Sequence, residues 1–174
     1  GHQTDISLAQ SMGLYDFRAR EYWPEWLDYL GLPQSALPQV NSTVADFGVL
    51  DIDSTRVPVR AMIADQQGAL FGYDCRQLGD AECTHGTASY VNVCLGDSAP
   101  QLDTIKVYLA WLLNEKPTYC LEADTTVTGA AVRWLKESAR LFDSDAELDV
   151  LADSVSDAGG LNFVPAFTGL NVPY

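Results

Sequence analysis

The middle of the chain carries the most regular pattern of hydrophobic and polar positions. Residues 57–64 are almost wholly apolar and predict a buried strand, and residues 66–74 follow with a short helical pattern. After a turn at Gly79 and Asp80, residues 81–95 predict one bent strand or two consecutive strands. This part of the chain is therefore expected to form a β-α-β unit.

A β-hairpin and two helices are predicted after this unit. Apolar and polar positions alternate over residues 104–113, which predicts a strand. A four-residue loop then leads into a second predicted strand over residues 118–123, so the two form a hairpin. The apolar side of the first hairpin strand is predicted to consist of Ile105, Val107, Leu109, Trp111 and Leu113. The period becomes helical over residues 129–142, and Ser144 with Glu147 has the spacing of a capping box that starts another helix.

The first part of the chain gives weaker signals. Pro24 opens a predicted helix at its first position, and Gly31 ends it. Residues 41–56 show no firm period and are expected to connect two structural units. Taken in order, these elements predict an α/β fold with a mixed sheet and flanking helices.

Asp65 lies at the junction between the predicted strand and the predicted helix. Open α/β sheets bind their ligands at the carboxyl ends of their strands, so an acid at this position reaches into a cleft. The N-terminus of the helix would keep its carboxylate ionised. Spacing alone favours a simpler role, in which Asp65 is the helix N-cap and Gln66 and Gln67 are solvated residues of the first turn.

Composition narrows the class of protein. The 174 residues, 47% of them hydrophobic, are enough for one domain with a core or for one lobe of a larger protein. The formal net charge of -14 repels nucleic acid and anionic membrane surfaces, so neither is an expected partner. An Asp-rich, Lys-poor surface also fits a high-salt cytoplasm, with an acidic mesophilic surface as the alternative.

Cysteine spacing and the absence of familiar motifs exclude several kinds of site. The four cysteines, Cys75, Cys83, Cys94 and Cys120, have no C-x-x-C spacing, so we expect no zinc site, no other metal ligands and no disulfide framework. Reduced cysteines and the lack of a signal peptide or of a long apolar run indicate a cytoplasmic protein without a membrane span. Phosphate-loop and nucleophile-elbow motifs are missing, and neither His2 nor His85 suits a hydrolase triad.

Four separated stretches resemble the FGGY carbohydrate kinases, and within them the glycerol kinases most closely. They are Thr4-Asp5 with Leu14-Tyr15-Asp16, Asp65-Gln66-Gln67 with Ala69-Leu70 and Gly72, Thr84 to Thr87, and Phe163 to Tyr174. The matches run collinearly over nearly the whole chain, which makes the resemblance far more specific than any one motif.

The resemblance implies an incomplete lobe of the actin and hexokinase type, which is ribonuclease H-like, from a kinase that binds ATP and polyol between two lobes. Residues 1–56 would be the end of the first lobe and a connection, and residues 57–174 the N-terminal part of the second lobe. The family assigns the role of catalytic base to the acid at Asp65. The residues implied in binding are Asp65, Gln66 and Tyr90 for the substrate, and Thr87, Gly129 and Arg133 for ATP.

The implied reaction is phosphorylation of a primary hydroxyl of glycerol or a related polyol, with ATP and Mg²⁺. A homo-oligomer of the parent protein is compatible with the resemblance. The isolated chain is expected to be inactive because parts of each binding site lie outside it. Two alternatives stay open: a kinase for another sugar such as a ketopentose, and a non-catalytic degenerate lobe. The second is motivated by Ala64 and Ala88, which stand where the family usually has glycine; Arg133 also replaces a usual glutamine.

Overall fold

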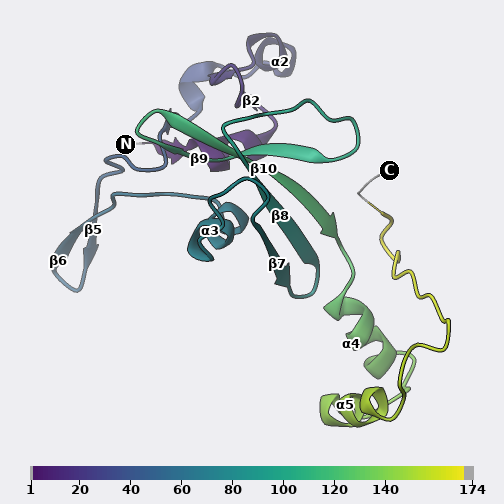
Figure 1. Ribbon diagram of the computed structural model, residues 1–174. Coiled ribbons are helices and arrows are strands. Elements are labelled where there is room, and N and C mark those ends of the chain that lie inside the picture. The colour runs from purple at the N-terminus through teal and green to yellow at the C-terminus, as the bar shows by residue number, and fades with distance from the viewer. Residues whose placement is uncertain (1, 171–174) are drawn as a thin grey trace. The chain divides into compact units, whose positions relative to one another are not determined.

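The computed structural model describes residues 2–170, and the chain divides into two compact units (Figure 1). The first unit consists of Gly1–Glu82 and Val91–Glu122, and the second of Cys83–Tyr90 and Ala123–Tyr174. The predicted division into residues 1–56 and 57–174 concerns the lobes of a larger protein, and it stays a prediction.

The first unit begins with short elements around β1 (Gln3–Asp5) and β4 (Gln39–Asn41), which pair in parallel. Between them lie α1 (Ile6–Ala9), the 3-10 helix η1 (Gln10–Met12), the antiparallel pair β2 (Tyr15–Asp16) and β3 (Glu21–Tyr22), α2 (Pro24–Leu30) and η2 (Gln34–Ala36). Helix α2 has Pro24 in its first turn and ends at Gly31, whose φ of 67° is a conformation that glycine adopts readily. The prediction of this helix from its local signals is confirmed.

Where the sequence predicts a connection, the structure has a β-hairpin of β5 (Val49–Ile52) and β6 (Thr55–Pro58). Its turn residues Asp53 and Ser54 have φ values of 47° and 67°, as tight hairpin turns require. The predicted strand over residues 57–64 is wrong, because β6 ends at Pro58, which has no N–H to donate to a ladder. The residues that follow bond irregularly to residues 43–48 instead, for example Met62 N to Thr43 O at 3.0 Å.

A four-stranded sheet follows, with the strand order β7–β8–β10–β9. Its strands are β7 (Ala81–His85), β8 (Ser89–Gly96), β9 (Lys106–Leu113) and β10 (Lys116–Thr125). Both the pair of strands predicted over residues 81–95 and the hairpin after it are confirmed. The hairpin turn has two residues rather than the predicted four, because Asn114 and Glu115 adopt φ values of 50° and 63° and close a tighter turn.

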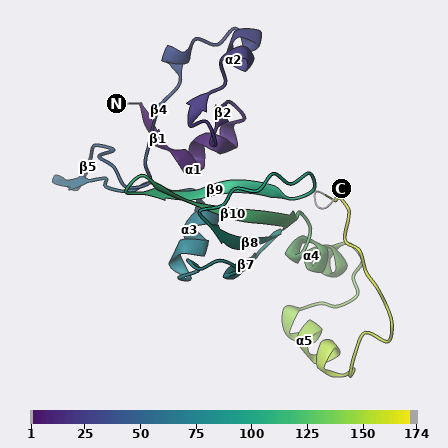
Figure 2. The same ribbon diagram turned by 45° about the horizontal axis from the view of Figure 1, so that its top comes forward.

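A bulge in β9 changes which of its side chains share a face. The register with β10 leaves Ala110 as an extra residue between Leu109 and Trp111. The predicted single apolar side of this strand is therefore wrong: Leu109 packs with Ile6, whereas Trp111 packs in a separate cluster with Leu70. Figure 2 shows α1 and α3 (Asp65–Gly72) on opposite sides of the sheet, so apolar residues are buried on both of its faces.

Side chains of the N-terminal segment cover the edge of β9. The side-chain amide of Gln10 donates to Leu109 O and accepts from Leu109 N, both at 2.8 Å. The hydroxyl of Thr43 accepts from Leu112 N at 3.0 Å. These contacts provide hydrogen-bond partners for backbone N–H and C=O groups of β9 that an unpaired edge strand would lack. They also hold the segment around α1 on the sheet.

The second unit contains α4 (Gly129–Glu137) and α5 (Asp145–Asp153). Helix α4 ends before Phe142, the predicted end, because the chain turns out of the helical conformation and Arg140 has a φ of 54°. One half of the predicted capping box is confirmed at α5, because Ser144 Oγ accepts from Glu147 N at 3.1 Å. The Glu147 carboxylate accepts from Asp143 N at 2.7 Å, one residue before the N–H that a capping box uses.

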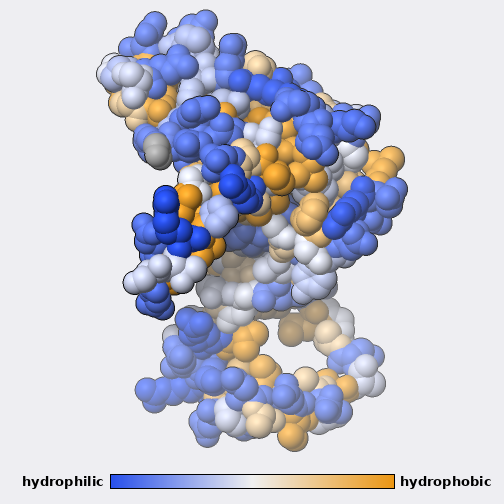
Figure 3. Space-filling view, turned by 90° about the vertical axis from the view of Figure 1, so that its left-hand side faces the viewer, coloured by the Kyte–Doolittle hydropathy of each residue, from blue (hydrophilic) through white to orange (hydrophobic). Residues whose placement is uncertain are grey.

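The C-terminal stretch of the second unit has little regular structure. Phe167 contacts Trp134 of α4, with ring centroids 4.9 Å apart. Several large apolar side chains in α5 and after it are exposed, namely those of Val150, Val155, Leu161, Phe163 and Val164. Figure 3 shows hydrophobic residues exposed among hydrophilic ones on one face of the molecule. The last four residues of the predicted family stretch, 171–174, lie outside the described residues.

All four cysteines are free. Cys83 is exposed, and the other three are buried. Among residues 2–170, no helix combines the length and the hydrophobicity that are needed to cross a membrane.

Candidate active site

Asp65 is the first residue of α3, and the N-cap is Ala64, which makes no side-chain capping bond. The simple interpretation of Asp65 as the N-cap is therefore wrong by one position. Its carboxylate is exposed and accepts one hydrogen bond, from the neighbouring Gln66 N at 2.8 Å. The carboxylate is therefore accessible to a ligand.

The two glutamines after Asp65 differ in their surroundings. Gln67 is buried, and its side-chain amide donates to Glu122 at 3.4 Å, so the prediction of a solvated first-turn residue is wrong for Gln67. It lies three residues before Leu70 and so shares the helix face that packs on the sheet. The side-chain oxygen of Gln66 is buried and has no hydrogen-bond partner among the described residues. A buried acceptor without a donor is costly, and a ligand hydroxyl is one group that would satisfy it.

Thr87 lies in the loop between β7 and β8, and this loop is bonded to the start of α4. Gly129 N donates to Gly86 O at 3.0 Å, and Thr128 N and Ala130 N donate to Thr87 O at 3.0 and 3.2 Å. A Cβ on Gly129 would lie 2.5 Å from Gly86 O, so only glycine permits this approach. The structure thus brings together two of the predicted ATP-binding residues, Thr87 and Gly129.

A chain of side-chain hydrogen bonds supports the same loop. His85 Nδ1 and Ser89 Oγ are 2.8 Å apart, and Ser89 Oγ donates to Thr128 Oγ1 at 2.9 Å. The Thr128 hydroxyl in turn donates to Gly86 O at 3.2 Å. Sequence reasoning missed these residues as a group, because residues 39 positions apart in the chain carry no joint signal.

The remaining predicted site residues are placed as follows. Tyr90 is half-buried in β8, next to Ser89, and Arg133 is exposed on α4, one helical turn after Gly129. Asp65 and Gln66 belong to the first unit, whereas Tyr90, Arg133 and the loop around Thr87 belong to the second.

The two alanines that replace family glycines fit their backbone conformations. Ala64 has φ and ψ of -66° and 151°, which is ordinary extended backbone for any residue. Ala88 is not among the described residues with positive φ. Neither position therefore requires glycine on conformational grounds.

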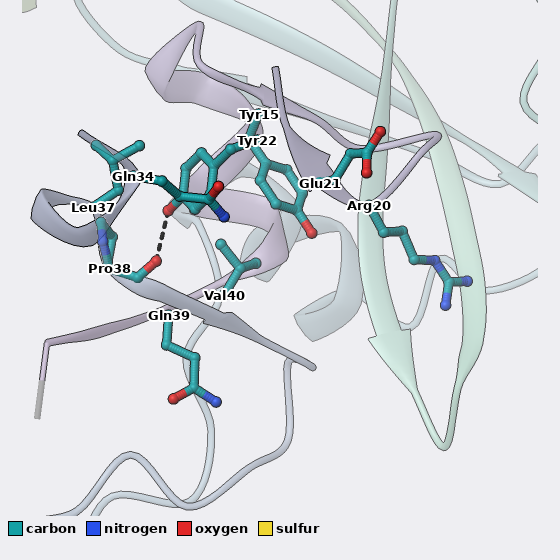
Figure 4. Close-up of a pocket in the computed structure, with 9 residues that line it drawn as sticks. All are labelled: Tyr15, Arg20, Glu21, Tyr22, Gln34, Leu37, Pro38, Gln39 and Val40. Atoms are coloured by element: carbon teal, nitrogen blue, oxygen red, sulfur yellow. Dashed lines mark hydrogen bonds between the residues drawn. The ribbon is translucent and has the colours of Figure 1, made fainter. Parts of the chain in front are cut away.

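The described residues contain a hollow of about 380 Å³ in the first unit, and none of the predicted site residues lines it (Figure 4). Figure 4 shows Tyr15 and Tyr22 beside Arg20 and Glu21, and the Tyr22 hydroxyl donates to Pro38 O at 2.7 Å. Burial raises the pKa of Tyr22, and it is also the largest cause of the raised pKa of Tyr15. Residues 2–170 hold no group of three or more His, Cys, Asp or Glu side chains placed to bind a metal ion.

A sheet covered on both faces, with an acid at the start of a helix that packs on it, defines part of a lobe of the actin and hexokinase type found in sugar kinases. The chain aligns over 173 residues with glycerol kinase 2 of Sulfolobus acidocaldarius, at 38% identity, and over 174 residues with glycerol kinase 2 of Saccharolobus solfataricus, at 36% identity. Each alignment covers 99% of this chain. Over its own length the chain is similar to the glycerol kinases, and the predicted resemblance is confirmed. No family model matches it.

Solved structures agree with this assignment. Glycerol kinase of Plasmodium falciparum, solved with ADP, superposes with a TM-score of 0.85 and 26% identity over 98% of this chain and 35% of its own. A xylulose kinase of Rhodospirillum rubrum gives 0.77 over 99% of this chain and 37% of its own; at 24% identity, that likeness concerns the fold alone. The chain spans about 35% of the length of the curated glycerol kinases that it matches.

Proposed function

We propose that this chain is a segment of an ATP-dependent kinase that phosphorylates a primary hydroxyl of glycerol or a related polyol. The observation that carries the proposal is the exposed carboxylate of Asp65 at the first turn of α3. It occurs in a chain that shares 38% identity with a glycerol kinase along 99% of its length. The net charge of -14 and the free cysteines support a cytoplasmic parent that binds neither nucleic acid nor a membrane.

Asp65 is assigned the role of general base. A primary hydroxyl is a weak nucleophile until its proton has an acceptor, and a positioned carboxylate takes that proton as the new bond to phosphorus forms. The buried side-chain oxygen of Gln66 lacks a donor among the described residues, and a polyol hydroxyl can supply one. Tyr90 is assigned to the carbon chain of the substrate, because its half-buried ring offers an apolar surface.

ATP, when bound, supplies the γ-phosphoryl group. The exposed Thr87 fits a phosphate-binding loop, and Gly129 at the start of α4 adds no side-chain bulk beside it. Arg133 adds an exposed cation one turn further along α4. The first N–H groups of α4 already donate to this loop, so we assign phosphate binding to the loop rather than to the helix N-terminus. Mg²⁺, when bound together with ATP, would be held chiefly by phosphate oxygens and water; residues 2–170 contain no group of three or more potential metal ligands.

Two alternatives to a polyol kinase are a kinase for another sugar, which the choice of substrate would distinguish, and a non-catalytic lobe, on which the backbone conformations of Ala64 and Ala88 bear. A ketopentose kinase would share this fold, as the likeness to a xylulose kinase illustrates. A degenerate, non-catalytic lobe is less favoured, because Ala64 and Ala88 both stand where their backbone needs no glycine. The isolated chain is expected to have no useful turnover, and measurable phosphorylation of glycerol by it would contradict that expectation.

The test is a panel of polyols and sugars assayed with ATP on the full-length parent and on its Asp65→Asn variant. We expect glycerol or a close polyol to be preferred, and Asp65→Asn to lower kcat on the order of a hundredfold or more with little change in KM. Asp145→Asn is the matched control, since Asp145 is also an exposed first residue of a helix. Equal activity of Asp65→Asn and Asp145→Asn would remove Asp65 from the mechanism.

A further inference from the structure

The backbone directly before Asp65 is held by a buried polar relay. Ala64 N donates to Ser7 Oγ at 2.8 Å, and the Ser7 hydroxyl lies 2.9 Å from both carboxylate oxygens of Asp5. Asp5 and Ser7 are fully buried, and Ala64 is 8% exposed. The hydrogen bond to Ala64 joins positions 57 residues apart in the chain.

The chemistry of the relay fixes its direction. An ionised carboxylate only accepts hydrogen bonds, so the single hydrogen of the Ser7 hydroxyl points to Asp5. The lone pairs of Ser7 Oγ are then left to accept from Ala64 N. Three further donors hold the carboxylate in place: Ser7 N, Leu8 N and the Thr43 hydroxyl, at 3.2, 3.0 and 3.3 Å.

A second hydrogen bond holds the same backbone two residues earlier. Met62 N donates to Thr43 O at 3.0 Å, while the Thr43 hydroxyl contacts Asp5. Residues 62 and 64 are therefore both bonded to a network centred on Asp5. The network thus bonds the backbone N–H of Ala64, the residue directly before α3 begins.

We propose that Ser7 and Asp5 are positioning residues for the carboxylate of Asp65 in the parent kinase. The inference rests on the proposed role of Asp65 as general base. Alignment of a base with its substrate within a fraction of an ångström is worth orders of magnitude in rate. Ser7 and Asp5 are fully buried, so both would act through the Ala64 peptide.

The test is a double-mutant cycle in the full-length enzyme with Ser7→Ala, Asp65→Asn and the combination. We expect Ser7→Ala to lower kcat on the order of tenfold to a hundredfold in the wild-type background, and by less than about twofold in the Asp65→Asn background. Ser7→Thr keeps the hydroxyl and should restore kcat to within about twofold of wild type. Ser11→Ala, at an exposed position four residues further on, is the matched control and should leave kcat unchanged.

Hydrogen exchange of the Ala64 amide gives a readout that is independent of activity. The exchange rate of this amide should be higher in Ser7→Ala than in wild type, and it should stay as low as in wild type in Ser7→Thr. An equal loss of kcat in both backgrounds, or an unchanged kcat in Ser7→Ala, would overturn the positioning role. A failure of the proposed function would look different, because Asp65→Asn alone would then leave kcat intact.

Discussion

A Cβ on Gly129 would lie 2.5 Å from the carbonyl oxygen of Gly86 and 3.2 Å from its carbonyl carbon. The two glycines are held together by the hydrogen bond from Gly129 N to Gly86 O at 3.0 Å. Glycine at position 129 is therefore required by the close approach of two backbones. This requirement exists without any nucleotide, so it is separate from the proposed role of Gly129 in binding ATP.

The first prediction concerns Gly129→Ala. Backbone atoms surround the new methyl group, and backbone moves less easily than the end of a side chain, so we expect a loss of about 1–3 kcal/mol in the free energy of unfolding. Thermal unfolding of the full-length protein would show it as a lower Tm. Gly72→Ala is the control, because a Cβ at Gly72 meets nothing within 4 Å; equal Tm values for the two variants would contradict the close approach.

Local signals in the sequence predicted the helices well. Pro24 and Gly31 bound α2, and Ser144 with Glu147 caps α5, because each of these signals acts within a few residues of the helix end. Long-range pairing was the harder part. The partner of residues 59–62 is the segment around Thr43, and no local pattern shows which segment will supply the hydrogen bonds of an irregular strand.

In the candidate site, too, local signals in the sequence were informative and long-range contacts were not. Resemblance to a family predicts site roles for Asp65 and Thr87, and these stay predictions, whereas spacing along the chain favoured a helix cap for Asp65. The supporting groups, Ser7 beneath Ala64 and Ser89 beside Thr128, were missed because small polar residues are common and their partners lie 57 and 39 positions away. The burial of Gln67 was missed for a related reason: the helix face that packs on a sheet depends on the sheet's position.

A second prediction separates the four thiols by reactivity. Cys83 is exposed, whereas burial raises the pKa of Cys75, and burial together with the nearby Glu122 carboxylate raises the pKa of Cys120 to about 12. Since the thiolate is the reactive form, Cys83 should be alkylated by iodoacetamide well before the other three. Peptide mapping by mass spectrometry after brief labelling measures this. Early labelling of Cys94 or Cys120 would contradict the burial seen here.

A third prediction concerns pH and Asp5. Burial raises the pKa of Asp5 above its ordinary value of 3.8, despite hydrogen bonds that lower it. Between 3.8 and the raised pKa, the folded state binds more protons than the unfolded state, so the contribution of Asp5 to stability falls as pH rises through this window. Above the window the contribution stays at its lower value.

Urea unfolding of wild type and Asp5→Asn from about pH 3.5 to pH 7 checks this sign. Asn cannot titrate, so the stability advantage of wild type over Asp5→Asn should be largest at the acidic end and shrink towards neutral pH. An advantage that grows with pH would mean that the hydrogen bonds from Ser7, Leu8 and Thr43 outweigh burial at this carboxyl.

The last prediction concerns salt. The chain carries 24 acids and 10 bases, and its ion pairs, such as Arg60 with Asp46 at 3.0 Å, lie on the surface, where each contributes little. Net repulsion among the carboxylates therefore remains, and salt screens it over a distance that shrinks to about 3 Å at 1 M. We expect stability to be higher in molar potassium chloride than in low salt. Replacing exposed acids of α5, as in Asp149→Lys with Asp153→Lys, should raise stability in low salt and reduce the salt dependence, because both changes remove repulsion. Thermal unfolding of both proteins across a potassium chloride series measures this, and greater stability of the wild type in low salt would show that repulsion is not what limits it.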